Sequence, residues 1–407
     1  MGTPTSQLVD GRRTRPKDRR ERIAMAAAIA FSERGYHQVS LSEVAAEVGI
    51  SAPALYRHFP NKYALFAEAA RRLAHGLIEA TDAVAGDDFP DADAASLDDP
   101  RSRLDAVLLA VIDATIENRR TGGLYHWEGR YLHDDDRERL RADFAELAAR
   151  VRRPVAALRP ELPAADVALL AAGALSVVAS ITDHRTALAQ RAISDLLLAS
   201  AEQVIAADLP ASALEPHEPA PGVPSASKRE AMVRAAISLF HRNGYHETSV
   251  EEISAAVGIT ASGLYRHFSG KGDILLEACV RAAERLAATT ADALGGAATP
   301  REALQRLIDA YVDHSFAHHE LMSVYFSDVG ALPEADRSRL RSIQRRHVEE
   351  WVSLVAAVRT DLSPTEARFA VHAGLNTVVD LGRLVHFDRA PETRARVGTI
   401  VRAALGV

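Results

Sequence analysis

Residues 49–59, GISAPALYRHF, recur 209 residues later as residues 258–268, GITASGLYRHF, and the two stretches agree at eight of their eleven positions. The agreement extends outward without a gap. Gly35-Tyr36 precedes the first copy as Gly244-Tyr245 precedes the second, and Lys62 follows the first as Lys271 follows the second. A repeat held at constant spacing over this length indicates two copies of one structural unit in a single chain.

Each copy predicts two short helices joined by a tight turn. The copies share a capping box, a turn glycine and a helix cap in the same order, which are Ser40/Glu43, Gly49 and Ser51 in the first copy and Ser249/Glu252, Gly258 and Thr260 in the second. A longer helix precedes each pair and another follows it. This arrangement is typical of a helix-turn-helix, whose second helix fits the major groove of DNA.

The duplication continues downstream, now at an offset of 200 residues, so that Pro100-Arg101 matches Pro300-Arg301 and Asp136-Arg137 matches Asp336-Arg337. With long 3.6-residue periodicity and few aromatic residues, the pattern predicts an all-α fold. We expect six segments: a mobile basic arm (1–15), a first helix-turn-helix domain (16–62), a first helical domain (63–209), a Pro-rich linker (210–227), a second helix-turn-helix domain (228–271) and a second helical domain (272–407).

Composition narrows the function classes. The net charge is −7, but residues 11–75 carry 12 lysines and arginines against 6 acidic residues, whereas residues 227–285 carry 8 against 7. The first copy is therefore better suited than the second to bind the phosphates of DNA. Cys279 is the single cysteine, which excludes an intrachain disulfide and predicts a core position. The longest uncharged run, between Asp166 and Asp183, reads as too short and too weakly apolar for a membrane span, so we expect a soluble cytoplasmic protein.

The pattern GxxxxxLYRHFxxK, after a first helix that ends in Gly-Tyr, resembles the DNA-binding domain of the TetR family of bacterial transcriptional regulators. That resemblance implies a three-helix DNA-binding module followed by a helical ligand-binding and dimerisation domain, with phosphate-contacting residues at Tyr56 and Lys62 and again at Tyr265 and Lys271. The layout is also similar to single-chain double-TetR regulators of actinobacteria, among them one that controls a mammalian-cell-entry lipid-import operon. The segment LYHWEGRYLHDDDR from Leu124 carries that closer likeness, which implies lipid- or redox-related target genes.

The expected DNA contacts come from the arm, the caps and the end of the second helix of each pair. They are Arg12, Arg13, Arg15, Ser40, Ser51, Ala52, Pro53, Tyr56, Arg57, His58 and Lys62 in the first copy, and Ser249, Thr260, Ala261, Ser262, Tyr265, Arg266, His267 and Lys271 in the second. Arg57 and Arg266 are the candidates for hydrogen bonds to guanine, and the Tyr, His and Lys side chains suit flanking phosphates. Because Pro53 of the first copy aligns with Ser262 of the second, the two halves of the DNA operator need not be identical.

The helical domains are less informative. Aromatic side chains that could line a pocket for a hydrophobic effector, such as an acyl or sterol derivative, are Tyr125, Trp127, Tyr131 and Phe144 in the first half and Tyr311, Phe316, Tyr325, Phe326, Trp351 and Phe369 in the second. Such aromatics are more often core. His314 and His318 lack further convergent ligands for a metal. No catalytic or nucleotide-binding motif is present, so we expect neither an enzyme nor a cofactor.

Ordinary TetR proteins are about half this length and pair through their last two helices. Here those helices fall at 165–184 and 191–206 in the first half, and at 364–386 and 392–405 in the second. We expect them to form one four-helix contact, which a linker favours by raising the effective concentration. The sequence thus predicts a monomeric pseudo-dimer, and a homodimer is the alternative assembly. We expect the protein to bind double-stranded DNA and to repress transcription until an effector binds. An architectural DNA-binding protein without an effector, or an enzyme or carrier with vestigial DNA-binding modules, is the alternative.

Overall fold

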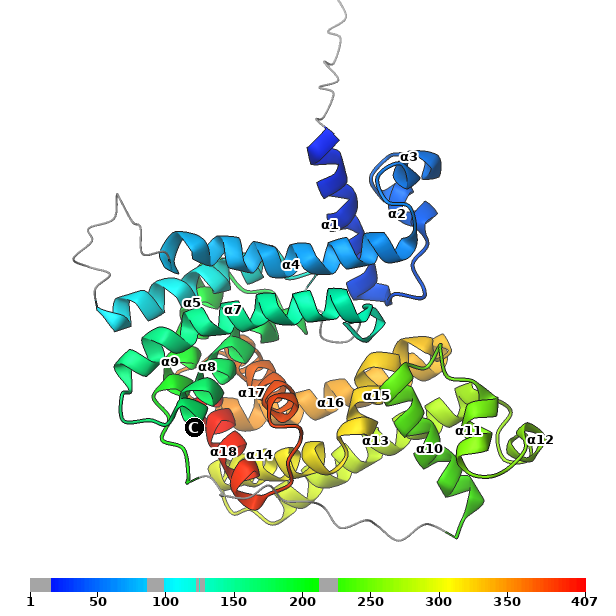
Figure 1. Ribbon diagram of the computed structural model, residues 1–407. Coiled ribbons are helices and arrows are strands. Elements are labelled where there is room, and N and C mark those ends of the chain that lie inside the picture. Colours follow the sequence, from blue (N-terminus) through cyan, green and yellow to red (C-terminus); the bar gives the residue numbers. More distant parts are fainter. Residues whose placement is uncertain (1–15, 86–98, 122–123, 125–128, 212–225) are drawn as a thin grey trace, which may run out of the picture.

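The computed structural model describes residues 16–85, 99–121, 124, 129–211 and 226–407, and over these residues the chain is all-helical (Figure 1). It consists of two related halves, α1 to α9 and α10 to α18. The first three helices of each half form a small module, α1–α3 or α10–α12. In Figure 1 the first module lies at the top and the second at the right, and the last two helices of each half pack together left of centre.

The first half contains α1 (Pro16–Arg34), α2 (Leu41–Glu47), α3 (Ala52–Tyr56), α4 (Lys62–Ala85), α5 (Pro100–Glu117), η2 (Gly129–Tyr131), α7 (Asp134–Leu158), α8 (Ala164–Ala179), η3 (Ser180–Thr182) and α9 (Gln190–Ile205). The second half contains α10 (Lys228–Asn243), α11 (Val250–Ala256), α12 (Ala261–Leu264), α13 (Lys271–Gly295), α14 (Pro300–Ala317), α15 (His319–Asp328), η4 (Val329–Ala331), α16 (Glu334–Val358), α17 (Pro364–Leu384) and α18 (Pro391–Leu405).

The local signals act as the sequence predicts at most positions. Both capping boxes form, at Ser40 and at Ser249. Gly49 and Gly258 adopt left-handed φ values of 69° and 68°, which side chains with a Cβ adopt only with strain. These turns set the angle between the two short helices in each module.

The cap of α3 differs from the prediction. Ser51 occupies the N-cap position, but its side chain makes no capping hydrogen bond. Pro53 has no amide hydrogen, and the amide of Ala54 donates to the Ser51 carbonyl. In the second copy the Thr260 hydroxyl accepts from the Gly263 amide at 3.2 Å. Ser51 therefore holds the N-cap position that the sequence predicts, but without the side-chain hydrogen bond of a cap.

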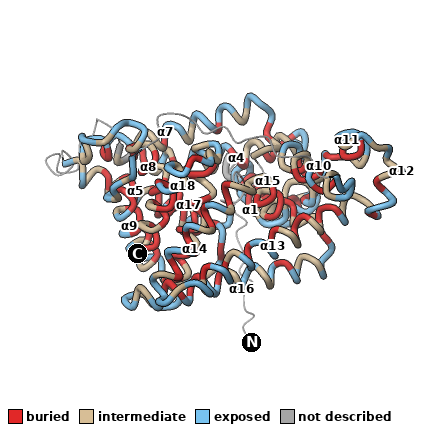
Figure 2. Tube along the Cα trace, turned by 90° about the horizontal axis from the view of Figure 1, so that it is seen from below, coloured by how far each residue is buried: buried red, intermediate tan, exposed pale blue. Residues whose placement is uncertain are grey.

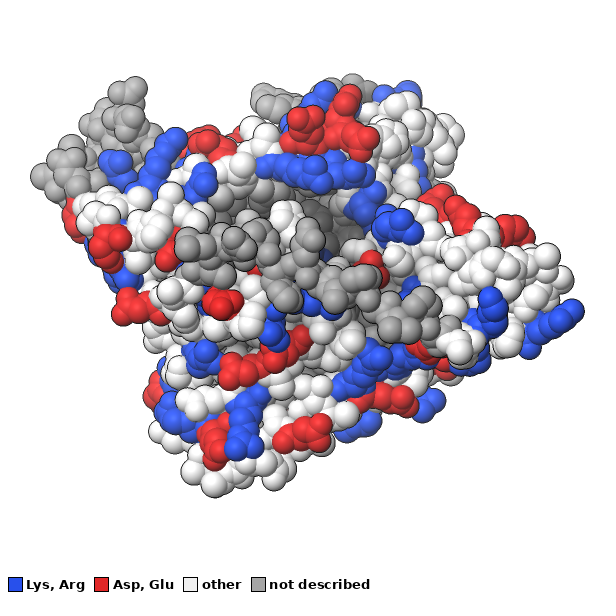
Figure 3. All heavy atoms as spheres, turned by 60° about the horizontal axis from the view of Figure 1, so that its bottom comes forward, with Lys and Arg blue, Asp and Glu red and all other residues white. Residues whose placement is uncertain are grey.

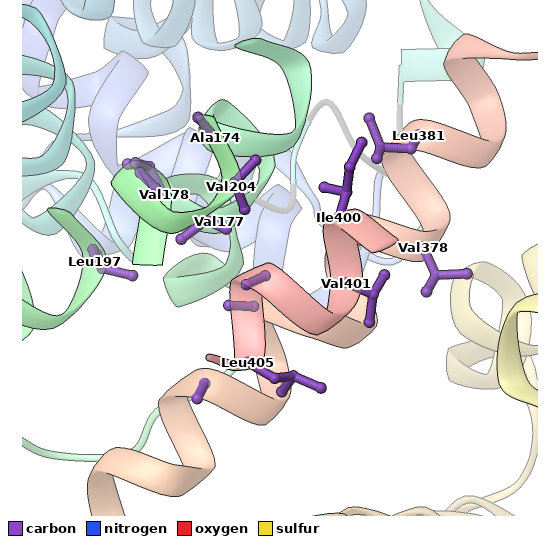
Figure 4. Close-up of a cluster of buried hydrophobic side chains, with 14 of the residues drawn as sticks. Ala174, Val177, Val178, Leu197, Val204, Val378, Leu381, Ile400, Val401 and Leu405 are labelled. Carbon is purple, nitrogen blue, oxygen red and sulfur yellow. The ribbon is translucent and has the colours of Figure 1, made fainter. Parts of the chain in front are cut away.

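The four-helix contact between the halves is built from small and branched apolar residues. Helix α8 packs against α17, and α9 against α18, with Ala174, Val204 and Ile400 among the buried side chains (Figure 4). A Cβ on Gly173 would lie 2.8 Å from Ile400 Cγ2 and 3.0 Å from Val204 Cγ1. The backbone of α8 thus approaches α9 and α18 at a distance that only glycine permits.

Polar contacts in this interface join unlike residues at equivalent positions. The Asn376 amide donates to the Ser176 carbonyl and hydroxyl at 3.0 Å each, and the Ser176 hydroxyl donates to Asp380 at 2.8 Å. Ser176 and Asn376 are equivalent under the 200-residue offset. At the rim the buried Arg396 pairs with Asp166. The two halves are therefore complementary rather than identical at this contact.

One stretch, Ala164–Thr182, is long and apolar enough to span a membrane by length and composition alone. The expectation that this run is too weakly apolar was wrong. Most of it is buried inside the protein, where α8 packs against α9 and α17. Figure 2 shows the buried positions concentrated along α8, α17 and α18. The apolar composition of Ala164–Thr182 is accounted for by the place of this stretch in the core that both halves share.

Candidate nucleic-acid interface and ligand pocket

Both modules expose a tyrosine at equivalent positions at the end of the second helix of the pair. Tyr56 is 52% exposed and Tyr265 is 55% exposed, whereas the neighbouring Leu55 and Leu264 are fully buried. The same aromatic side chain is thus exposed at equivalent positions of both modules. The hydroxyl and ring face of each are available to a partner.

The other predicted contact residues surround these tyrosines. Exposed side chains are Ser40, Ser51, Pro53, Arg57, Thr260, Ser262, Arg266 and His267, and partly buried ones are Ala52, His58, Lys62, Ser249, Ala261 and Lys271. Within the part of the chain that the structure describes, the exposed guanidinium groups of Arg57 and Arg266 form no ion pair or hydrogen bond. Arg12, Arg13 and Arg15 lie outside the described residues.

Lys62 and Lys271 have an additional role within the protein. The Lys271 ammonium donates to the carbonyls of Tyr245, His246 and Thr248 at 2.8, 3.1 and 2.8 Å, and it lies 4.6 Å from the Tyr245 ring centre. Lys62 repeats this arrangement with the His37 carbonyl at 3.2 Å and the ring of the preceding tyrosine. Burial lowers the pKa of Lys271. These lysines fasten the start of α4 or α13 to the turn after α1 or α10.

A second repeated contact fixes the end of the helix pair. Arg20 lies over the Phe59 ring at 4.5 Å and faces Glu68, and Arg229 lies over Phe268 at 4.5 Å and pairs with Glu277. The Arg20 guanidinium also donates to the carbonyl of His58 at 2.9 Å. Each arginine therefore joins the first helix of its module to the segment that carries the exposed tyrosine.

The two modules touch each other through the equivalent turns that follow α1 and α10. The imidazole centres of His37 and His246 are 4.5 Å apart, and His37 Nε2 lies 3.6 Å from a Glu247 carboxylate oxygen. The Gln38 side-chain amide donates to the Gly330 carbonyl at 2.9 Å. This contact fixes the position of one module relative to the other.

A buried ion pair lies next to this junction and also joins the two halves. Arg130 in η2 binds Asp328 at the end of α15, and Asp328 is only 3% exposed. Burial raises the pKa of Asp328, and the Arg130 guanidinium opposes that shift. Tyr131 lies beside Gly244, where a Cβ would approach its hydroxyl to 2.9 Å. Residues of the first half thus contact the second half at the base of the second module.

Charge is mixed elsewhere on the molecule. Acidic and basic side chains alternate over the face shown in Figure 3, with no large region of one sign. The net charge of −7 is therefore not gathered into one repulsive field on that face. Local placement of cations, rather than the total, governs what each module can bind.

A cavity of about 860 Å³ lies in the second half. Its walls come from α13, α14, α15, α16 and α17, with apolar groups such as Leu286, Tyr311 and Leu340 and polar ones such as Thr290 and His372. Ser32 and Glu33 of α1, and residues 182, 183 and 185 after α8, complete the lining. Its volume falls within the range of small-molecule sites.

A hydrogen-bonded chain at this cavity defines the state of His347. The Trp351 indole can only donate, and it does so to His347 Nε2 at 3.2 Å. His347 Nδ1 therefore carries the proton and donates to the Thr290 hydroxyl, 3.0 Å away. Burial lowers the pKa of His347 to about 4. The imidazole is neutral at pH 7, so His347 adds no charge to the cavity.

With the geometry in place, comparison with known families identifies the modules. Residues 23–69 and 232–278 both match the family described as "Bacterial regulatory proteins, tetR family", and residues 297–382 match the "Tetracyclin repressor-like, C-terminal domain". The two modules belong to the TetR family. The chain carries these two TetR DNA-binding helix-turn-helix modules in tandem, as the repeated sequence indicates.

Individual TetR relatives match over parts of the chain. The HTH-type transcriptional activator FasR of Mycolicibacterium smegmatis is 35% identical over 68 residues, which are 17% of this chain and 31% of that protein. The HTH-type transcriptional repressor KstR2 of Mycobacterium tuberculosis is 27% identical over 132 residues, 32% of this chain and 65% of its own length. The alignments thus span less than two thirds of these relatives.

Solved TetR structures cover about one half of the chain at a time. The structure of KstR2 from Mycobacterium tuberculosis gives a TM-score of 0.40 at 22% identity and covers 45% of this chain and 95% of that one. A TetR-family regulator from Bordetella parapertussis gives 0.42 at 20% identity, with 44% and 95% covered.

The predicted ligand residues separate into several groups in this TetR fold. Tyr311, Tyr325 and Phe326 line the cavity, whereas Phe316, Trp351 and Phe369 pack in the core around it. Tyr131 lies at the module junction, and Phe144 packs between the core of the first module and the core that both halves share. Tyr125 and Trp127 lie outside the described residues.

Sequence reasoning missed the non-aromatic lining and the contribution of α1. Leu286, Thr290 and His372 had no distinguishing pattern, because an apolar position at helical spacing reads as core in any bundle. The proximity of Ser32 and Glu33 to a cavity in the other half depends on how the halves pack. Cys279 is buried as predicted, and burial raises the pKa of its thiol to about 12.

Proposed function

We propose that this chain is a cytoplasmic transcriptional repressor that binds an asymmetric double-stranded DNA operator through its two unequal modules. A small hydrophobic effector, of acyl or sterol type, releases it. The observation that carries the proposal is the junction at His37 and His246, which holds two TetR modules together in one chain. Two helices that must enter successive major grooves about 34 Å apart need such a fixed relation.

The exposed side chains support DNA as the partner. Tyr56 and Tyr265 suit phosphate contacts, and Arg57 and Arg266 suit guanine edges. Lys62 and Lys271 contribute positive charge near the same surface, although their ammonium groups also bind carbonyl oxygens of the protein. The modules differ at Pro53 and Ser262, which is the basis for proposing unequal half-sites.

The interface between the halves supports a monomer. Arg396 and Asp166, and likewise Asn376 and Ser176, make contacts that join one half to the other. Under the 200-residue offset Arg396 corresponds to Leu196, so two copies of the first half could not form that ion pair. The first half therefore fits the second half better than it fits a second copy of itself.

The cavity supports an effector. Its lining is largely apolar, with a neutral His347 on one wall, and Glu33 at its edge belongs to the helix that precedes the first helix pair. An occupant that displaces α1 changes the position of the first module. Simultaneous contact of both modules with the operator is then lost.

Footprinting on the DNA upstream of its own gene tests the proposal. We expect one defined protected site with two unlike halves, and loss of one half-site's protection in each of the variants Tyr56→Ala and Tyr265→Ala. Reporter transcription should rise in both variants. Diffuse protection with steep salt dependence would instead indicate an architectural DNA-binding protein, and lower reporter transcription in the variants would indicate an activator.

A further inference from the structure

The two halves treat equivalent space differently. In the second half, Thr290 and Leu286 of α13 and Glu350 of α16 line the cavity. The equivalent residues of the first half are Thr81 and Leu77 of α4, at an offset of 209, and Arg150 of α7, at an offset of 200. The change from Glu350 to Arg150 reverses the charge at one position of the wall.

Arg150 occupies the first half's counterpart of the cavity. Its guanidinium donates to the Thr81 hydroxyl at 2.7 Å and to the Ile78 carbonyl at 2.8 Å, and it pairs with Asp82 at 2.6 Å. The Arg150 side chain is 10% exposed and Thr81 is fully buried. A buried, multiply bonded arginine is costly to displace, because its partners would be left unpaired.

The second half leaves the equivalent space open. Glu350 is exposed, and the Thr290 hydroxyl binds His347 rather than a residue in the position of Arg150. The position of Phe144 in the first half is taken by Gln344, an exposed residue at the cavity. Removing an arginine and a phenylalanine from the wall leaves room for an occupant.

The open cavity also belongs partly to the first half. Ser32 and Glu33 lie in the last turn of α1, directly before the turn that carries His37. Glu33 is held by Arg120 of the first half at 2.8 Å. An occupant of the second half's cavity is therefore in contact with the first DNA-binding module.

We infer that each chain has a single effector site, in the second half, and that the first half's counterpart is closed by its own Arg150. The occupant is a mainly apolar molecule with one polar end, because the buried lining residues are uncharged. The charged lining residues are all exposed, and they are Arg341, Arg346 and Glu350 on α16 and Glu33, Asp183 and Arg185 of the first half. This inference rests on the proposed function, and it makes the chain asymmetric in sensing as well as in DNA binding. The effector site in one half regulates the module of the other.

Titration with a dansyl-labelled undecanoic acid, a fluorescent fatty acid, tests the count of sites on the full chain. We expect one probe per wild-type chain. Filling the second cavity with Leu286→Trp should weaken binding by about tenfold or more, whereas the matched variant Leu77→Trp in the first half should leave it unchanged. Two probes per wild-type chain, or equal effects of the two tryptophans, would overturn the inference.

Two further variants test the closure by Arg150 and the contribution of α1 to the cavity wall. Arg150→Ala should add a second, weaker site, and a variant that still folds by circular dichroism but binds one probe would contradict closure by Arg150. Glu33→Trp on α1 should weaken probe binding, whereas Arg242→Trp at the equivalent position of α10 should not. An equal response to these two would contradict the shared wall.

Gel-shift assays with the operator separate this inference from the proposed function. One bound probe per chain in a protein that binds no DNA would sink the regulator and leave the single site standing. Operator binding that the probe releases, together with two probe sites per chain, would support the regulator and overturn the single site.

Discussion

The imidazole rings of His37 and His246 meet with their centres 4.5 Å apart, at equivalent positions of the two DNA-binding modules. Each lies in the turn after the first helix of its module, and the carbonyl of each accepts a hydrogen bond from the lysine that begins the next long helix. The repeat thus contributes the same side chain twice to one contact. The separation of the recognition helices depends on this contact.

Acidification should loosen this junction. Burial is the main cause of the lowered pKa of both His37 and His246; nearby Lys62, Lys271 and Arg130 act in the same direction, against Glu247 and Asp328. The closed contact therefore binds fewer protons than the separated modules, so it is fully stable above about pH 6.5 and weakens as pH falls through the lowered pKa values.

Fluorescence energy transfer between dyes on Glu47→Cys and Ala256→Cys measures this effect, because Cys279 is buried and should not be labelled. Transfer should fall between pH 7.5 and pH 5.5. Adding His37→Asn and His246→Asn should flatten the response. A pH response that is the same with and without the histidines would assign the titration to other groups.

Tyr265 and Lys271 should separate DNA affinity from stability. Tyr265→Ala removes an exposed ring and should weaken operator binding with little change in melting temperature. Lys271→Met leaves three carbonyls without their donor and should lower the free energy of unfolding by about 2 kcal/mol. Calorimetry and gel shifts on the same samples check both, and a melting temperature unaffected by Lys271→Met would rule out the fastening role.

Arg130 should be needed chiefly because Asp328 is buried. Arg130→Ala leaves that carboxylate without its partner and should cost about 3–5 kcal/mol. Combining it with Asp328→Asn should recover a large part of the loss, and a double-mutant cycle in chemical denaturation measures the coupling. Additive effects would mean that the pair contributes nothing to the junction.

Gly173 should be sensitive to a single methyl group. A Cβ there meets Ile400 and Val204 at 3.0 Å or less, so Gly173→Ala should destabilise the chain by about 1–3 kcal/mol through overpacking. Gly76 lies in a helix with open space around the same atom, and Gly76→Ala should stabilise by about 1 kcal/mol. Thermal unfolding of both variants gives the comparison, and equal shifts would contradict close packing at α8.

The local features of this fold were predictable, and the contacts between distant segments were not. The capping boxes at Ser40 and Ser249 and the left-handed glycines at the turns follow from residues within four positions of each other. The last two helices of each half lie within a few residues of the ranges that the TetR resemblance implies, except that α8 ends at Ala179 and a short 3-10 turn follows it. Ser51 holds the N-cap position, but its hydroxyl does not accept from the Ala54 amide as the Thr260 hydroxyl accepts from Gly263.

The module junction and the shared cavity have no local signal. His37 and His246 are 209 residues apart, and each is an ordinary turn histidine in its own context. Arg150 reads as a solvated residue of an amphipathic helix until Thr81 and Asp82 are placed beside it. Such roles are set by how two already folded halves meet, which the sequence pattern of either half does not encode.

The mass of the protein bound to its operator tests the central claim that one chain provides both reading helices. Light scattering during size-exclusion chromatography should give one 43.9 kDa chain for the free protein and one chain per operator duplex in the complex. Two chains on a single duplex, at protein concentrations near the dissociation constant, would contradict the pseudo-dimer and place four reading helices on the DNA.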